Sequence, residues 1–246
     1  MLELIVSQNE VRVSLPEALD SVTIARLYAD LCAAMQGHAG AVVLQGTEGL
    51  FCRGLDFEYV LRAGYKDFDP VIRMFVELLL LLRHGPKPTI AVVDGEARGA
   101  GAGIAAATDL VIATPASEFG LPEALFGIGS EVFAPFLRER VAPQKARLLG
   151  LISHAWTAEE AYRLGLVDRV VDITALAREV KTAARRMSLA NPAGVAILKG
   201  HMAGRGPEAL RAEVEIGAKE TLTTIRDPQV RDRIRRFMVE GVAPWR

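Results

Sequence analysis

Residues 89–113 restrict the fold more than any other part of this chain. Two short apolar runs, TIAVVD at 89–94 and LVIA at 110–113, have the length of buried strands. The segment between them consists mainly of glycine and alanine, which predicts a helix with very small side chains. Because strand, helix and strand follow one another here, a parallel sheet with crossover helices is favoured. The middle of the helix contains no carboxylate or histidine, so any chemistry there must come from the backbone.

The same alternation continues in the preceding part of the chain, and from about Gly127 onward the pattern is helical almost throughout. We therefore expect an α/β core domain over residues 1–195 and a helical C-terminal region over 196–246, which serves as an oligomerisation or lid element. The expected earlier elements are a hairpin over 2–6 and 11–15, a helix around 24–35, a strand at 41–45, an irregular stretch over 46–69 and a helix from 72 to about 84.

Composition narrows the range of functions. A chain of 246 residues, half of them hydrophobic, is long enough for one well-buried core. Its net charge of −1 gives no general attraction to nucleic acid or to an anionic membrane, so neither is an expected partner. The apolar run Phe75–Leu82 is interrupted by Glu77 and is too short to span a bilayer. Cys32 and Cys52 have no CxxC spacing, which argues against a disulfide framework or a zinc site and favours a cytoplasmic location.

The glycine-alanine segment has two ordinary interpretations. Gly101, Gly103 and Ala106 fit the G-x-G-x-x-A form of a dinucleotide fingerprint, with Glu123 about twenty residues later as the ribose-binding acid. Against this, residues 94–100 separate the strand from the first of these glycines. The other interpretation is a helix that packs closely on a neighbour through its small residues.

A second glycine-containing stretch adds a third interpretation. The sequence FCRGLDF at 51–57 follows the expected strand at 41–45. Two glycine-containing turns after neighbouring strands can direct two backbone N–H groups at a single oxygen atom. The two stretches together therefore favour a site that is built from the main chain.

Four motifs resemble the crotonase, or enoyl-CoA hydratase/isomerase, superfamily, and the resemblance covers about residues 1–200. It implies a spiral core of ββα units with a helical C-terminal region, assembled as a homotrimer or a hexamer. The motifs are FCRGLDF, PTIAVVDGEARGAGAG, ATDLVIATPASEFGLPEALFGI and WTAEEAYRLGLVDRVV.

Three further segments are most similar to the dehydratases of polyketide β-branching cassettes. Those enzymes remove water from a 3-hydroxy-3-methylglutaryl group on an acyl carrier protein and give the 3-methylglutaconyl thioester. The resemblance therefore implies a thioester substrate, a carrier-protein partner and no metal or redox cofactor. The segments are SEFGLPEALFGI, FAPFLRERVAPQKA and DPQVRDRIRRFMVEGVAPWR.

The superfamily resemblance implies an oxyanion hole in which the backbone N–H groups of Leu55 and Ala100 donate to the thioester carbonyl. Ala100 replaces the glycine that is common in the family, but its amide is retained. The neighbouring glycines are implied to give the substrate close access to the backbone: Gly54, Gly99, Gly101 and Gly103.

Hydratases of the superfamily usually carry two catalytic glutamates, whose positions fall on Gly103 and Glu123 in this chain. With only one acid left, Glu123 is implied to remove the C2 proton and then to assist departure of the C3 hydroxyl. A raised pKa in an apolar site suits this exchange. The ordinary alternative is a helix-entry acid beside Pro122. Glu131 lies where some dienoyl isomerases of the superfamily place a second acid, but an acid in the first turn of a helix also explains it.

A glutaryl substrate carries a second carboxylate, which needs a cation if it is buried. Arg53, Lys66 and Arg73 come from segments that line the site in relatives, and the sequence does not choose among them. Residues 14–23 lack the basic residue that often contacts coenzyme A in the family, in agreement with a carrier-bound substrate. The basic residues of 231–236 are explained equally by an acidic carrier or by a water-facing helix.

Two rival functions remain at this point. A 3-enoyl to 2-enoyl thioester isomerase also moves a proton with one glutamate. A noncatalytic crotonase-like scaffold that binds a carrier protein is the alternative from another class.

Overall fold

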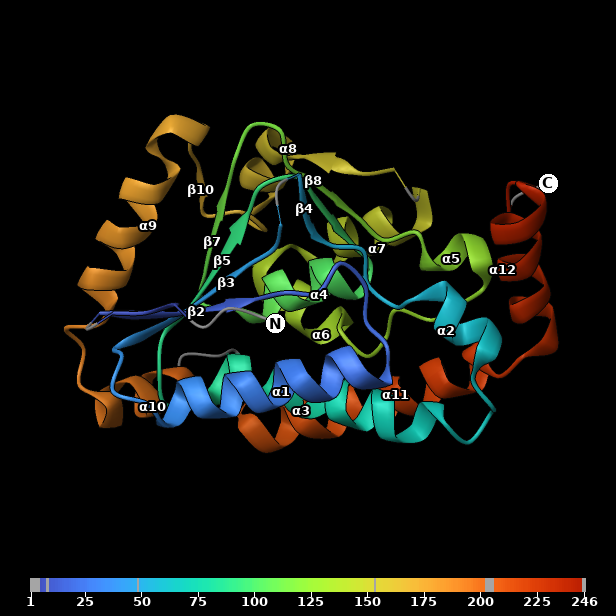
Figure 1. The fold of residues 1–246 in the computed structure, drawn as a ribbon, viewed down its shortest axis with the longest axis horizontal. Helices are drawn as coiled ribbons and strands as arrows, with labels where there is room; N and C mark the ends of the chain where they lie inside the picture. Colours follow the sequence, from blue (N-terminus) through green and yellow to red (C-terminus); the bar gives the residue numbers. More distant parts are fainter. Residues whose placement is uncertain (1–4, 8, 48, 153, 202–205, 245–246) are drawn as a thin grey trace.

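A six-stranded sheet forms the centre of the computed structural model, which describes residues 5–7, 9–47, 49–152, 154–201 and 206–244 (Figure 1). Its strands lie in the order β1-β2-β3-β5-β7-β10. All neighbours are parallel except β1 and β2, which form the expected hairpin; residues 2–4 of that prediction lie outside the described residues. The strands are β1 (Ile5–Val6), β2 (Glu10–Ser14), β3 (Ala41–Gln45), β5 (Thr89–Val93), β7 (Leu110–Ala113) and β10 (Arg169–Val170).

Helices cover both faces of this sheet. On one face, α1 (Ser21–Gln36) packs against α3 (Phe68–His84), which in turn packs against α11 (Pro207–Ile225) (Figure 1). On the other face, α9 (Ile173–Met187) contacts β2 and β3. Val42 faces the first layer and Val43 faces α9, because successive side chains of a strand point to opposite faces. A sheet buried on both sides explains why its strands appear in the sequence as continuous apolar runs.

Local signals in the sequence account for α1. The carboxylate of Asp20 accepts hydrogen bonds from the N–H groups of Val22 and Thr23, and the Thr23 hydroxyl accepts one from the Asp20 N–H. This capping box satisfies N–H groups that have no partner inside the helix. The buried side chains then recur at helical spacing: Ile24, Leu27, Leu31, Ala34 and Met35.

A second, four-stranded sheet in the order β4-β6-β8-β9 was not expected from the sequence. Its strands are two or three residues long, too short for an alternating pattern to be detected. The expected irregular stretch over 46–69 contains the first of them as well as a short helix, α2 (Phe57–Arg62). The strands are β4 (Leu50–Cys52), β6 (Glu96–Arg98), β8 (Glu118–Gly120) and β9 (Trp156–Thr157).

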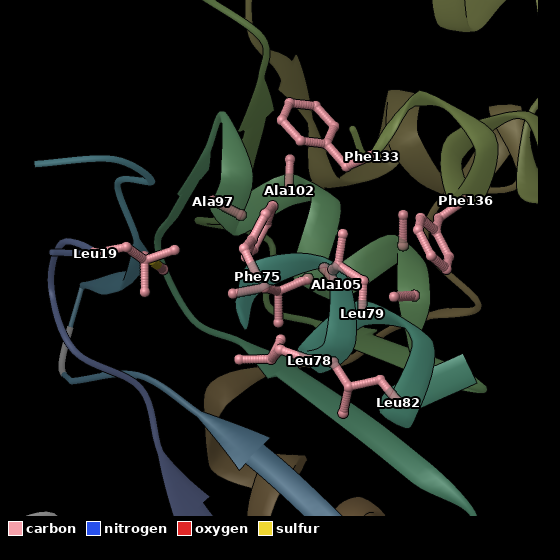
Figure 2. Packing of buried hydrophobic residues seen from close by; sticks show 14 of the residues in the cluster. Leu19, Phe75, Leu78, Leu79, Leu82, Ala97, Ala102, Ala105, Phe133 and Phe136 are labelled. Carbon is pink, nitrogen blue, oxygen red and sulfur yellow. The ribbon is translucent and has the colours of Figure 1, made fainter. Parts of the chain in front are cut away.

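The glycine-alanine helix α4 (Ala100–Ala107) packs between α3 and α6 (Ala134–Arg140). Figure 2 shows Ala102 and Ala105 among the larger side chains of these neighbours, including Leu79 and Phe133. A Cβ at Gly103 would lie 2.6 Å from the Phe133 side chain. The small residues therefore do serve close helix packing over most of α4, which leaves only its first turn for another role.

The C-terminal helices belong to the same core as the rest of the chain. Buried side chains of α11 and α12 (Pro228–Glu240), such as Val214 and Ile234, join the main apolar cluster. The expected boundary between 195 and 196 falls inside α10 (Pro192–His201). Over the described residues, no helix is both long enough and apolar enough to cross a bilayer. The remaining helices are α5 (Glu123–Phe126), α7 (Pro143–Ile152) and α8 (Ala158–Leu164).

A buried ion pair fixes α10 to the core. The Nζ atom of Lys199 lies 2.8 Å from Oδ2 of Asp109 and also donates to the carbonyl oxygens of Leu82 and Lys87. The same Oδ2 atom accepts hydrogen bonds from the N–H and hydroxyl of Thr89, at 2.8 and 2.9 Å. Each buried polar atom in this group therefore has a partner.

We predict that Lys199→Met lowers the free energy of unfolding by about 3 kcal/mol, because it leaves the Asp109 carboxylate in the interior without its closest cation. Guanidinium denaturation measures this change. Lys181→Met, at an exposed position of α9, is the matched control and should change stability by less than about 0.5 kcal/mol. Equal effects of the two substitutions would contradict the prediction.

Candidate active site

The two glycine-containing turns meet where the parallel strands β4 and β6 end. Gly54 has a φ of +84°, and a Cβ placed on it would lie 2.9 Å from the backbone nitrogen of Ala100. Gly99 precedes α4 with a φ of +53°. Residues with a side chain rarely adopt a positive φ, so glycine permits both turns. Without a Cβ, the two turns can also contact each other directly.

The N–H groups of Leu55 and Ala100 are left available by this arrangement. The N–H of Leu19 donates to the carbonyl of Gly54, and the N–H of Asp56 donates to the carbonyl of Leu19. This parallel bridge uses the neighbours of Leu55 and not its own N–H. Ala100 is the first residue of α4, where an N–H has no acceptor inside the helix. Neither N–H has a backbone acceptor within the part of the chain that the structure describes.

The carboxyl group of Glu123 lies over the same turn. Glu123 begins α5, three residues after the end of β8, and β8 pairs with β6. A Cβ on Gly99 would approach Oε1 of Glu123 to 2.3 Å. Part of the residue reaches the surface, but its Oε2 atom is buried and has no hydrogen-bond partner among the described residues. The side chain therefore points into the protein and not into solvent.

Burial of this carboxyl raises its pKa to about 7, because the charged form loses hydration. A hydrogen bond from the backbone N–H of Glu123 itself opposes the increase, and the nearby charge of Glu131 adds to it. A carboxyl with a pKa near neutral can accept a proton and return it within one reaction cycle. The ordinary helix-entry interpretation of Glu123 accounts for neither the burial nor the unpartnered oxygen.

A mostly apolar pocket adjoins the two N–H groups and the carboxyl. Leu55, Ala100 and Glu123 all line it, together with Gly99, and Thr221 of α11 contributes to its wall. Within the described residues, the lining contains one cation, Arg53, and one acid, Glu123. The apolar side chains of the wall are Leu19, Ile24, Phe57, Val71, Ile72, Phe75, Ile128, Val132 and Phe133.

The pocket separates the three cations that the sequence left as equal candidates. Arg53 lines it, whereas Lys66 is exposed in the segment between α2 and α3. Arg73 is exposed on α3 and lines a different groove, together with Glu77 and Glu215. Lys66 and Arg73 are therefore not among the described residues that line the pocket beside Glu123.

Two of the four implied substrate-binding glycines have close packing contacts within the protein. A Cβ on Gly101 would lie 2.1 Å from the carbonyl oxygen of Cys52, and one on Gly103 would meet the side chain of Phe133. Phe133 itself lines the pocket. An aromatic side chain thus fills the space beside Gly103, the position that the resemblance matched to a second glutamate, and no pattern in the sequence predicts this contact.

Glu131 is not a first-turn acid of α6, contrary to the ordinary interpretation of the sequence. Helix α6 begins at Ala134 with Phe133 as its N-cap, so Glu131 lies in the preceding turn, where it is exposed. It lines a neighbouring groove with Arg138 and Arg147. Its effect on the candidate site is electrostatic, through the pKa of Glu123.

The arginines of α12 all have partners within the chain. Arg231 and Arg233 donate hydrogen bonds to backbone carbonyls of neighbouring helices. Arg235 forms ion pairs with Asp232 and Glu240. The Nε atom of Arg236 lies 4.0 Å from Oε2 of Glu240.

A sequence profile described as enoyl-CoA hydratase/isomerase matches residues 11–246. The chain belongs to the enoyl-CoA hydratase/isomerase family. Membership confirms the crotonase fold and removes the dinucleotide-binding alternative, in agreement with the packing contacts found at Gly101 and Gly103.

Individual members of the enoyl-CoA hydratase/isomerase family give a finer comparison. Bacillaene synthase dehydratase PksH of Bacillus subtilis (strain 168) is 31% identical over 209 residues, which cover 83% of this chain and 78% of PksH. The crystal structure of a putative polyketide biosynthesis enoyl-CoA hydratase (pksH) from Bacillus subtilis has a TM-score of 0.81 and 25% identity over 97% of both chains. Carnitinyl-CoA dehydratase of Proteus mirabilis (strain HI4320) is 30% identical over 181 residues, 73% of this chain and 66% of that enzyme.

The pKa of Glu123 predicts a pH-dependent stability difference between the wild type and Glu123→Gln. Because the pKa rises from 4.5 to about 7 on folding, the folded state holds the proton more tightly than the unfolded state. The resulting stabilisation is complete below pH 4.5 and is lost as the pH rises through 7. From pH 5 to pH 8 the wild type should therefore lose up to about 3 kcal/mol relative to the glutamine variant.

Denaturant unfolding of both proteins at several pH values measures this difference. Glu220→Gln, which removes an exposed acid of α11, is the control for the loss of one carboxyl group. A stability difference between wild type and Glu123→Gln that stays constant from pH 5 to pH 8 would contradict the pKa assigned to Glu123.

Proposed function

We propose that this chain removes water from a 3-hydroxy-3-methylglutaryl thioester on an acyl carrier protein and gives the 3-methylglutaconyl thioester, as a step of polyketide β-branching. The observation that carries the proposal is the buried carboxyl of Glu123, the one acid among the described residues that line the pocket, which lies over the Gly99 turn beside the Leu55 and Ala100 N–H groups. The similarity to PksH, a protein named as a dehydratase of bacillaene synthase, supports the same reaction class.

The first half of the reaction uses the oxyanion hole. The thioester carbonyl accepts hydrogen bonds from the N–H groups of Leu55 and Ala100 while the Glu123 carboxylate removes the C2 proton. The electron pair of the C2–H bond moves toward the carbonyl oxygen and forms an enolate. Each N–H donor placed for this oxygen is worth about 3 to 4 kcal/mol in the transition state.

The second half returns the proton. Glu123, now a carboxylic acid, gives its proton to the C3 hydroxyl as the C3–O bond breaks and the C2=C3 double bond forms. Water leaves, and Glu123 is again a carboxylate. Both proton transfers use one acid on one face of the substrate, which fits the packing of Phe133 beside Gly103 in place of a second glutamate. No step uses a metal or redox cofactor.

Arg53 is the group that we assign to the second carboxylate of the glutaryl substrate. It lines the pocket that contains Glu123, and it is exposed, so the anion need not be completely desolvated. A guanidinium can bind a carboxylate through two parallel hydrogen bonds. Arg53 therefore favours a substrate with a distal anion over a simple acyl thioester.

We predict that Glu123→Gln lowers the rate of dehydration by at least about a hundred-fold, because the amide neither removes the C2 proton nor protonates the leaving hydroxyl. The assay is mass spectrometry of 3-hydroxy-3-methylglutaryl carrier protein, with the corresponding coenzyme A thioester in parallel. Loss of the mass of one water by the wild type is the expected result.

The same measurement tests the rival functions. Loss of water followed by loss of carbon dioxide would show that the chain also decarboxylates. An unchanged mass with the wild-type protein would refute the dehydratase, and a 3-enoyl thioester would then be supplied to test for isomerase activity. If neither substrate reacts, the remaining candidate function is that of a noncatalytic scaffold that binds a carrier protein.

We further predict that Arg53→Gln lowers kcat/KM for the glutaryl thioester by about ten-fold or more, since the substrate loses a charge-assisted hydrogen bond. The same variant should leave kcat/KM for a 3-hydroxy-3-methylbutyryl thioester nearly unchanged, because that substrate has no distal carboxylate. Arg73→Gln is the matched control on α3. Equal losses for both substrates would show that Arg53 does not recognise the carboxylate.

A further inference from the structure

Helix α12 packs against the two short helices that carry the candidate chemistry (Figure 1). Helix α2 begins at Phe57, two residues after Leu55, and α5 begins with Glu123. With six and four residues, both are too short to be stable as isolated helices, so their positions depend on their surroundings. Two arginines of α12 donate hydrogen bonds to the C-terminal ends of these two helices.

Arg231 binds the C-terminal end of α2. One guanidinium nitrogen donates to the carbonyl oxygen of Leu61 at 2.7 Å, and the other donates to that of Ala63 at 2.9 Å. The guanidinium also lies 5.3 Å from the centre of the Tyr65 ring. Carbonyl groups in the last turn of a helix have no donors inside the helix, and a cation at this end is favourable.

Arg233 binds the end of α5 in the same way. Its Nη1 atom donates to the carbonyl of Phe126, the last residue of that helix, at 3.4 Å. The following residue, Gly127, has a φ of +81°, and a Cβ on it would lie 2.7 Å from Nη1. The guanidinium thus rests directly on the backbone that ends α5.

Aromatic side chains connect the three helices. Phe237 of α12 packs edge-to-face on Phe126, with ring centres 5.3 Å apart. Phe126 packs in the same manner on Phe57, the first residue of α2, at 4.7 Å. Phe57 also lines the pocket. A continuous row of rings therefore extends from α12 to the wall of the candidate active site.

We infer that α12 is a positioning element: Arg231, Arg233 and Phe237 set the distance between α2 and α5, and thereby hold the Glu123 carboxyl over the two N–H donors. This inference rests on the roles proposed above for Glu123 and Leu55. Attachment of α12 to the core does not require these three side chains, because Val230 and Ile234 are buried beneath the helix. Phe237 is 40% exposed, so its ring adds little to the core.

The test compares the double variant Arg231→Gln/Arg233→Gln and the single variant Phe237→Ala with Arg235→Gln. Arg235 lies on the same helix and pairs with residues of that helix, so it controls for the loss of a charge. We expect kcat for dehydration to fall about ten-fold or more in the first two variants, since small displacements of a reacting group are costly. KM should change much less, because no α12 residue is among the described residues that line the pocket.

A second measurement separates positioning from general structural support. If α5 moves outward, the Glu123 carboxyl gains water and its pKa falls, so the acid limb of the pH profile of kcat/KM shifts to lower pH. Glu131, whose charge acts on Glu123, and Arg53, in the same pocket, are intact in all these variants. The variant Arg231→Gln/Arg233→Lys keeps one donor for the Phe126 carbonyl and should recover part of the kcat that is lost in Arg231→Gln/Arg233→Gln.

Wild-type kcat in both the double variant and Phe237→Ala would overturn the inference, as would an equal loss in Arg235→Gln. If the wild type dehydrates nothing, the proposed function fails and the positioning role is tested without activity. The pH dependence of unfolding is then compared, with and without Glu123→Gln, in the wild type and in Phe237→Ala. A midpoint displaced to lower pH in Phe237→Ala supports the inference, and an unchanged midpoint overturns it.

Discussion

The contact between two glycine turns is the constraint on which the candidate site depends. Gly54 can approach the Ala100 nitrogen only because it has no side chain, and a Cβ there would be 2.9 Å from that atom. The parallel pairing of β4 with β6 brings the turns to one place, and the bridge from Leu19 to the loop fixes which N–H groups remain available. Because these constraints are made by backbone atoms of the core, they resist rearrangement more strongly than side-chain contacts would.

The protonation state of Glu123 depends on burial and not on backbone packing. Glu123 lies on a short helix, and its buried oxygen has no partner among the described residues, so its ionisation is opposed by lost hydration. Ionisation of Glu123 near neutral pH therefore destabilises the folded protein. With a pKa of about 7, the carboxyl exists in both protonation states near neutral pH, and a proton exchange within one reaction requires both states.

The sequence was sufficient to predict the large elements, and it pointed to the two glycine turns and Glu123, which the structure brings together. The parallel strands at 41–45, 89–93 and 110–113 have strong apolar patterns, and the glycines of both turns are visible by inspection. The second sheet was not predicted, because strands of two or three residues leave no periodic signal. The sequence also does not choose among Arg53, Lys66 and Arg73 as the cation for the substrate carboxylate, since that choice depends on how α2 and α3 lie in space.

The C-terminal helices show another limit of prediction from sequence. Thr221 reaches the pocket, and α12 binds the ends of α2 and α5, although Arg231 is 170 residues from Leu61 in the sequence and Arg233 is 107 residues from Phe126. The two N–H groups follow strands β4 and β6 of the second sheet, and α2, which follows Leu55, is also bound by α12. The Glu123 carboxyl has two supports: β8, which pairs with β6 and precedes α5, and Arg233 of α12, which binds the end of α5. Because residues far apart in the sequence set the position of this one carboxyl, no local pattern in the sequence predicts it.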